Sequence, residues 1–401
     1  MKSARFYSAI LCLAVLLAAG CGGNMTSPTS PITPACVAST KPEFSYILTG
    51  YSVSMFTVNS CSGQFTASTP SSISTGYASP QIDAEQMVAD PLGRFAYVAN
   101  LVSNASDLAT ISMYTINPST GVLTATTPAT VPTGYFPQTI AIDPLGRFVY
   151  TANSDDSTVS MFTINQTTGV LTPTAPTSVS TIIPNQILSI PSFLTVDPTG
   201  KFLYVTASLS DGSAVFMYNI NQTTGFLTPT SPAIVSTGGL PFQVIIAPNG
   251  KFAYVVNNLS GGSMTDGVWQ YTVDSATGVL TPNNPVAVPA GNGPTAIAVD
   301  PTSSFAYVVN RIDNTLTMYT INPDTGNLTL NSTKTYPTGI IAAGPMPYRI
   351  DFDSTGKFLY VTNEAGPAFI YTVNNDGTLT NVGATGVGSG GYSTAFTTVS
   401  Q

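Results

Sequence analysis

Short segments in which apolar and polar residues alternate recur along this chain, and together they form a unit of about 50 residues. In one copy of the unit, an aliphatic run at residues 139–142 ends at an Asp-Pro-Leu-Gly turn, and residues 147–153, rich in aromatic and β-branched side chains, follow it. Residues 159–164 alternate in polarity, and a Thr-Gly turn then leads to residues 170–172. Each segment is typical of a β-strand, and Pro and Gly take their usual places in the turn. Because no segment of the unit has helical periodicity, the pattern predicts an all-β fold.

The repeat is marked most clearly by the pair Phe-x-Tyr, which occurs seven times at intervals of 50 to 54 residues. The seven pairs are Phe44/Tyr46, Phe95/Tyr97, Phe148/Tyr150, Phe202/Tyr204, Phe252/Tyr254, Phe305/Tyr307 and Phe358/Tyr360. Four antiparallel strands in such a period form one propeller blade, so seven copies predict a seven-bladed β-propeller. The first unit lacks an innermost strand, and the strand at residues 392–399 has no Phe-x-Tyr after it. We therefore expect this C-terminal strand to complete the N-terminal blade and close the ring.

The first forty residues follow a different pattern, that of an export signal and a tether. Lys2 and Arg5 precede an apolar run at residues 9–17, which is too short to span a bilayer. The sequence Leu-Ala-Ala-Gly-Cys that ends at Cys21 resembles a bacterial lipobox, in which the cysteine is lipidated. An ordinary secretory signal is the alternative. The predicted segments are a signal peptide over 1–20, lipidated Cys21 with a Pro-punctuated tether over 21–40, and the propeller over 41–401.

This N-terminal pattern predicts a place in the cell envelope, with the membrane as a partner through the lipid, on the periplasmic or the outer-membrane and cell-surface side. After removal of the signal, Cys36 and Cys61 are the cysteines that carry no lipid. Because an exported compartment permits disulfides, we predict a Cys36–Cys61 bond. Two free thiols are the alternative.

Composition excludes several functions. The chain has no histidine, which excludes a Ser-His-Asp triad, a Cys-His pair and a histidine-ligated metal. With 11 basic and 19 acidic residues it lacks the basic surface that nucleic acids require. No loop has the spacing of a metal-binding motif. We therefore predict no nucleic acid, no metal and no cofactor, and we expect a monomer.

Two rows of variable residues stand where the repeat leads into the innermost strands. The residue after the recurrent Pro gives Glu85, Gln138, Ser192, Phe242, Thr295 and Tyr348. The next position gives Gln86, Thr139, Phe193, Gln243, Ala296 and Arg349. Propellers bind ligands at the mouth of the central channel, and variable loop positions on a repeated scaffold are typical of a binding site. Unconstrained loop ends vary in the same way, so this interpretation has a structural alternative.

Glu85 and Arg349 are the only charged members of the two rows, and they fall in the blades that flank the closing blade. We predict Glu85 as a general base or a ligand acceptor and Arg349 as a clamp for a carboxylate or oxyanion. A salt bridge that stabilises the closure is the alternative. The predicted ligand-binding residues are Gln86, Gln138, Gln243 and Tyr348, together with Arg311 from a loop on the same face.

The repeat Asp-Pro-x-Gly-Arg/Lys-Phe-x-Tyr-Val-x-Asn, followed by Thr-Gly-x-Leu-Thr, resembles the lactonase family of seven-bladed propellers over roughly residues 40–401. That family includes 6-phosphogluconolactonase-type enzymes and muconate cycloisomerase relatives. Tyr360-Val361-Thr362-Asn363 also matches the signature of the related YVTN repeats of surface layers. The active sites proposed in the enzymatic members use His, Arg and Glu in the channel, and this chain has no His, so the resemblance transfers no catalytic set.

Two functions of different classes remain. The first, which the low charge, the polar faces and the lipid tether favour, is an extracytoplasmic module that binds a small molecule or a protein in its channel. The second, which the resemblance implies, is a lactone hydrolase that opens a sugar lactone. Family membership without a catalytic set says more about scaffold than chemistry, so the binding module is the main prediction.

Overall fold

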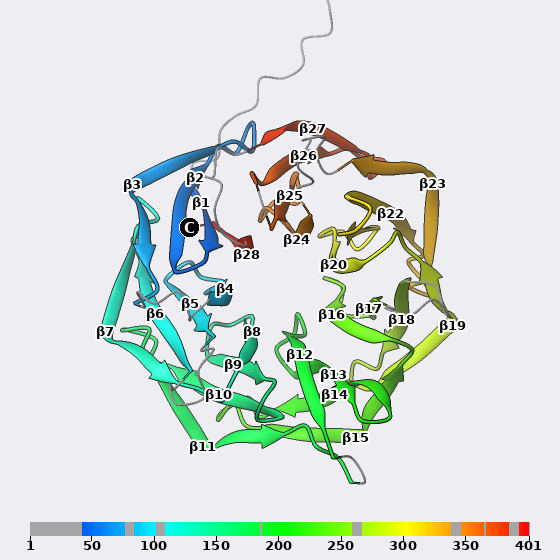
Figure 1. Ribbon diagram of the computed structural model, residues 1–401, viewed down its shortest axis with the longest axis horizontal. Helices are drawn as coiled ribbons and strands as arrows, with labels where there is room; N and C mark the ends of the chain where they lie inside the picture. Colours follow the sequence, from blue (N-terminus) through cyan, green and yellow to red (C-terminus); the bar gives the residue numbers. More distant parts are fainter. Residues whose placement is uncertain are drawn as a thin grey trace, which may run out of the picture. The chain divides into compact units, whose positions relative to one another are not determined.

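The computed structural model describes residues 42–76, 84–101, 109–184, 187–258, 267–337, 346–364, 366–384 and 393–400. Within these residues 28 strands form seven four-stranded antiparallel sheets, which stand as blades around a central channel (Figure 1). The described part of the chain contains no helix, and so none that is long and apolar enough to cross a membrane. The predicted all-β, seven-bladed propeller is confirmed.

The strands occupy equivalent places in every blade. The innermost strands are β28 (Ser393–Ser400), β4 (Ala84–Ala89), β8 (Pro137–Ile142), β12 (Ser189–Val196), β16 (Leu240–Ile246), β20 (Pro294–Val299) and β24 (Pro347–Phe352). The second strands are β1 (Glu43–Thr49), β5 (Phe95–Asn100), β9 (Phe148–Asn153), β13 (Phe202–Leu209), β17 (Phe252–Asn258), β21 (Phe305–Asn310) and β25 (Phe358–Asn363). The third strands are β2 (Ser52–Val58), β6 (Thr110–Ile116), β10 (Thr158–Ile164), β14 (Gly212–Ile220), β18 (Gly267–Val273), β22 (Thr315–Ile321) and β26 (Phe369–Val373). The outermost strands are β3 (Phe65–Ser74), β7 (Leu123–Pro132), β11 (Leu171–Ser180), β15 (Leu227–Thr237), β19 (Leu280–Pro289), β23 (Leu328–Pro337) and β27 (Leu379–Ala384).

The ring closes through the blade that combines both ends of the propeller. Strand β28 pairs antiparallel with β1, with Phe44 opposite Val399 and Tyr46 opposite Thr397. In Figure 1 the dark red β28 accordingly lies beside the blue β1. The C-terminal strand thus completes the N-terminal blade, as predicted, and covers an edge of β1 that would otherwise be open.

In five blades a recurrent Asp fixes the turn between the first two strands: Asp90, Asp143, Asp197, Asp300 and Asp353. Asp143 accepts the backbone N–H of Phe148 at 2.8 Å and pairs with the Arg147 side chain at 2.8 Å. Asp197 accepts the backbone N–H groups of Lys201 and Phe202, both at 2.7 Å. These repeated charges therefore have a structural role in the turn.

The Phe-x-Tyr pair joins each blade to the next. The Tyr hydroxyl donates a hydrogen bond to the carbonyl of the glycine in the following blade's Thr-Gly turn or its equivalent. The seven bonds are Tyr46–Gly121, Tyr97–Gly169, Tyr150–Gly225, Tyr204–Gly278, Tyr254–Gly326, Tyr307–Gly377 and Tyr360–Gly63. These aromatics thus link neighbouring blades, and the last bond spans the closure of the ring.

The predicted signal peptide and tether, with Cys21 and Cys36, lie outside the described residues. Cys61, in the loop between β2 and β3, is disulfide-bonded. Its pairing with Cys36 stays a prediction.

Candidate functional site

Six innermost strands carry a β-bulge at the same place. In β24 the pairing partner shifts between Pro347 and Arg349, so Tyr348 is the unpaired residue. The equivalent bulged residues are Glu85, Gln138, Ser192, Phe242 and Thr295. They form, with Tyr348, the first of the two variable rows. A bulge re-aims side chains and is common beside active sites, so the repeated bulge gives this row a distinct orientation.

The bulges lie at one face of the ring, which we call the mouth face. This face is formed by the loops that lead into the innermost strands and by the loops that follow the second strands. The backbone joins the two sets of loops. Ser154 donates its N–H to the carbonyl of Phe136 at 3.0 Å, and Glu364 donates to Met346 at 3.0 Å. Both sets therefore share one face, as predicted.

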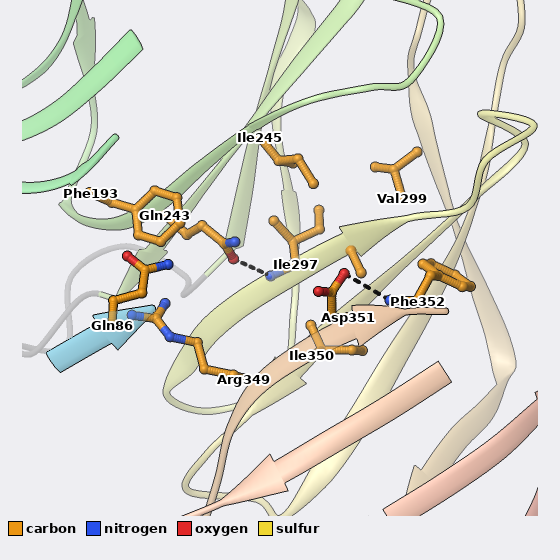
Figure 2. A pocket seen from close by; sticks show the side chains of 11 residues that line it. Gln86, Phe193, Gln243, Ile245, Ile297, Val299, Arg349, Ile350, Asp351 and Phe352 are labelled. Atoms are coloured by element: carbon orange, nitrogen blue, oxygen red, sulfur yellow. Dashed lines mark hydrogen bonds between the residues drawn. The ribbon is translucent and has the colours of Figure 1, made fainter. Parts of the chain in front are cut away.

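A cavity of about 210 Å³ lies between the innermost strands below the mouth face. Its polar lining is Gln86, Gln243, Arg349 and Asp351, and its larger apolar lining is Phe193, Ile245, Ile297, Val299, Ile350 and Phe352. Figure 2 shows these side chains converging from β4, β12, β16, β20 and β24. The structure thus brings together three of the predicted site residues, Gln86, Gln243 and Arg349.

Arg349 reaches from β24 to the strand three blades away in the ring. Its guanidinium carbon lies 5.3 Å from the ring centre of Phe193 on β12 and 5.1 Å from that of Tyr348. Both distances are those of cation–π contacts. Figure 2 shows the guanidinium next to the Gln86 side chain, on the side of the cavity where Phe193 lies. The two aromatic rings therefore hold the Arg349 cation in the channel.

The two glutamines of the cavity also connect neighbouring blades. Oε1 of Gln243 accepts the backbone N–H of Ile297 at 2.7 Å, and Oε1 of Gln86 accepts that of Ile140 at 3.2 Å. Thr139, in the same row, accepts from Leu194 at 3.1 Å. This structural role was not predicted. Because each carbonyl oxygen is held by a backbone donor, the amide nitrogen of each glutamine is the part that can donate to a ligand.

Asp351 is the titratable group that sequence analysis missed. It lies two residues after Arg349 on β24, so both side chains leave the same side of the strand. Burial raises the pKa of Asp351 to about 7; the N–H of Phe352, which donates to its Oδ1 at 2.9 Å, opposes the shift, and the nearby charge of Asp353 adds to it. A carboxyl group in a cavity with a pKa near neutrality is a candidate for proton transfer.

A third row of the repeat would have singled out Asp351. The equivalent positions of the other innermost strands are Val88, Ala141, Thr195, Ile245 and Ala298. Asp351 is the only acid in this row, which lies deeper in the strand than the variable loop ends.

Of the other predicted site residues, Tyr348 contacts Arg349 but is not among the residues that line the cavity. Glu85 is in β4, but its side chain is outside the described part, so its role as a base stays a prediction. Gln138 is the bulged, half-buried residue of β8 and does not line the cavity. Arg311 forms a bidentate ion pair with Glu364, with both N–O distances at 2.7 Å. Among the described side chains, no three His, Cys, Asp or Glu residues gather as a metal site would need.

Comparisons with known proteins agree with this architecture. The family model described as "Lactonase, 7-bladed beta-propeller" matches residues 43–187 and 243–391, which is more than half of the chain. No curated protein matches the chain in sequence.

Several solved structures share the fold. A candidate 6-phosphogluconolactonase from Bacteroides fragilis is 20% identical with a TM-score of 0.66, over 89% of this chain and 98% of that one. The periplasmic gluconolactonase of Pseudomonas aeruginosa is 19% identical with a TM-score of 0.65, over 89% and 99%. Hydrazine synthase of Kuenenia stuttgartiensis is 17% identical with a TM-score of 0.54, over 90% and 100%. At these identities the likeness concerns the fold, which carries more than one chemistry.

Proposed function

Since this chain belongs to the lactonase family of seven-bladed β-propellers, we propose that its channel cavity binds a small lactone and hydrolyses it. The observation that carries the proposal is Asp351, a carboxyl group with a pKa of about 7 in a cavity that also presents a guanidinium and two amides. A base with such a pKa is about half ionised at neutral pH. General base catalysis is most effective when the pKa of the base lies near the operating pH. The chemistry needs no histidine.

In the proposed reaction the carboxylate of Asp351 accepts a proton from water while the water oxygen bonds to the lactone carbonyl carbon. The carbonyl oxygen becomes an oxyanion, which the guanidinium of Arg349 and the amide N–H groups of Gln86 or Gln243 stabilise. The bond between that carbon and the ring oxygen then breaks. The ring oxygen takes the proton from Asp351, so the product is an open hydroxy acid and the carboxylate is restored.

A binding module without turnover is the second candidate. It is supported by the way the cavity is held: two aromatic rings fix Arg349, and backbone N–H groups fix Gln86 and Gln243. Such preorganised groups bind a polar ligand at little cost in side-chain entropy. This function predicts saturable binding of small lactones with no ring opening.

Incubation with a panel of small lactones separates hydrolysis from binding without turnover, with the release of acid as the measurement. We expect wild-type turnover, and a loss of about 100-fold or more in kcat for Asp351→Asn, because the amide cannot accept the proton. The wild-type kcat should rise with pH through a single ionisation near pH 7 and level off above it, since only the carboxylate is a base. Asp351→Asn should lack this ionisation.

Asp274→Asn is the matched control. Asp274 lies in an exposed turn where its carboxylate accepts backbone N–H groups, and other repeats place Asn at the equivalent positions, such as Asn165 and Asn221. Its turnover should match the wild type. If Glu85→Gln abolished turnover while Asp351→Asn kept it, the base would be Glu85. If the wild type bound lactones without any turnover, the protein would be a binding module and not a hydrolase.

We also propose that the protein is exported and lipid-anchored at Cys21. The lipobox-like sequence before Cys21 supports this location, as does the disulfide at Cys61, because disulfides persist in exported compartments.

A further inference from the structure

We propose that the cavity selects a lactone with an alkyl or aryl substituent over a polyhydroxylated sugar lactone. This inference rests on the proposed function and names the substrate class of the same site. Two independent features carry it: the distribution of polar groups with depth in the channel, and the side chains at the mouth face.

The polar groups of the cavity are concentrated at one level. Gln86, Gln243 and Arg349 occupy the same row of their strands, two positions after the start of the bulge. Ile245, Ile297, Val299 and Phe352 line the rows below this level, and Asp351 is the only polar side chain there among the described residues that line the cavity. Figure 2 shows the same division, with the aliphatic side chains grouped away from Arg349 and the glutamines.

This division fits an amphipathic ligand. A carbonyl group between Arg349 and Asp351 would meet donors and a base, and the rest of the ligand would lie against aliphatic side chains. A sugar lactone carries hydroxyl groups on most of its ring carbons. Apart from a hydroxyl that reaches Asp351, each hydroxyl that enters the apolar part would lose its hydrogen bonds to water without replacing them, which lowers affinity. An alkyl or aryl group would be stabilised there by the hydrophobic effect.

A phosphorylated sugar is a poor match as well. Among the described residues that line the cavity, Arg349 is the only cation, and its guanidinium is stacked on two aromatic rings. Phosphate groups are usually bound by several Arg or Lys side chains or by backbone N–H groups together.

The mouth face is apolar where the innermost strands begin. Ile190, Leu240 and Met346 are 41%, 44% and 39% exposed, although large apolar side chains are usually buried. Each stands directly before the proline of a bulged strand and three residues before a side chain that lines the cavity. Met346 holds a positive φ of 38°, a strained conformation for a residue with a side chain. An apolar substrate would therefore meet apolar side chains on its way into the channel.

The cavity is of modest size. Its volume is about 210 Å³. This is room for one ring with a short substituent.

The test compares lactones that share a six-membered ring: δ-hexalactone and δ-octalactone against glucono-δ-lactone and its 6-phosphate. Purified full-length protein is assayed for acid release and, separately, for binding by thermal shift. We expect kcat/KM to be at least about tenfold higher for the alkyl lactones. Higher kcat/KM for either sugar lactone would overturn this inference and leave the proposed hydrolysis intact. Binding of alkyl lactones without turnover would support the proposed selectivity and overturn the proposed hydrolysis. If the alkyl lactones neither bound nor turned over, both proposals would be overturned.

Val299→Thr tests the apolar surface itself, because threonine keeps the volume of valine and adds a hydroxyl group. We expect it to lower kcat/KM for δ-octalactone by about tenfold without lowering that for glucono-δ-lactone. The matched control is Val255→Thr, a fully buried valine outside the cavity. If Val299→Thr and Val255→Thr changed both substrates equally, the loss would be one of folding and the apolar surface would not select the substrate.

Discussion

Glu43 is a buried carboxyl group where most other blades carry a cation. It precedes Phe44, and the equivalent residues are Arg94, Arg147, Lys201, Lys251, Ser304 and Lys357. Glu43 is 5% exposed, and its Oε1 accepts the N–H and the hydroxyl of Ser354, both at 3.1 Å. Burial raises the pKa of Glu43, and the charge of Asp353 adds to the shift. The ionised form is therefore disfavoured in the folded protein.

Glu43→Gln should consequently stabilise the protein at neutral pH. A group whose pKa is higher in the folded state contributes stability below its unfolded pKa of about 4.3 and loses it as the pH rises through the folded value. The amide of this variant would keep an acceptor for Ser354 without the charge, so we expect a higher Tm than wild type at about pH 7.5 and an equal Tm at about pH 4. Thermal unfolding at the two pH values measures this difference.

The control for that variant is Glu364→Gln, since Glu364 is 7% exposed in its side chain but has a bidentate partner in Arg311. Here the substitution leaves a cation with a weaker partner, and Tm should fall at neutral pH. A fall in Tm for both variants would mean that the carboxylate of Glu43 stabilises the closure.

At the residue scale, the sequence predicts the roles of residues that recur in every blade. It does not predict properties that depend on contacts between neighbouring blades. The Phe-x-Tyr pairs reveal the blades because the same residues recur in the same local context. The pKa of Asp351 depends on burial among side chains from several blades, which no local pattern records. The contacts of Gln86 and Gln243 with the next blade depend on the relative height of two strands that do not pair.

At the scale of the elements, the inner strands were predicted closely and the outermost strands were not. The sequence pattern placed strands at 147–153 and 159–164, and the structure has β9 at Phe148–Asn153 and β10 at Thr158–Ile164. The fourth strand was predicted at 170–172, whereas β11 extends over Leu171–Ser180. Most of β11 is exposed or half-buried, so it lacks the apolar alternation from which the other strands were inferred.

The contact between a Phe-x-Tyr strand and the next blade's glycine turn allows a test of how the blades are held together. Tyr254 donates to the carbonyl of Gly326 at 2.8 Å, and a Cβ added to Gly326 would overlap the ring of Phe252. Gly326→Ala should therefore destabilise the protein both through its φ of +71° and through this overlap. We expect a loss of roughly 2–4 kcal/mol in the free energy of unfolding, measured by denaturant titration.

Gly250→Ala separates the two causes. Gly250 has the same φ of +71° but nothing within 4 Å of an added Cβ. It should cost about 1 kcal/mol, the effect of the left-handed conformation alone. Equal losses for the two variants would show that the Phe252 ring moves aside freely and that the glycine is needed only for its backbone.

At the scale of the whole molecule, the number of blades and the closure could be predicted, and the cavity could not. Seven spaced copies of one motif determine the ring, and a missing innermost strand at one end with a spare strand at the other determines how it closes. The cavity exists only after five innermost strands stand around one channel. Its location near the mouth could be predicted, because four residues of the variable rows line it, but its acid, Asp351, belongs to a deeper row.

The proposed lipid anchor at Cys21 can be tested on the whole chain. Replacement of Cys21 with alanine should remove lipidation and release the protein from the membrane fraction, because the thiol is the acceptor of the lipid in a lipobox. Fractionation of cells and intact-mass measurement of the purified chain test this: the wild type should be membrane-bound and heavier by the acyl groups. Cys36→Ala is the matched control, since this cysteine lies beyond the proposed cleavage site and should leave the anchor in place. An unlipidated wild-type chain cleaved at another residue would support the ordinary secretory signal instead, and the propeller would then work as a released protein.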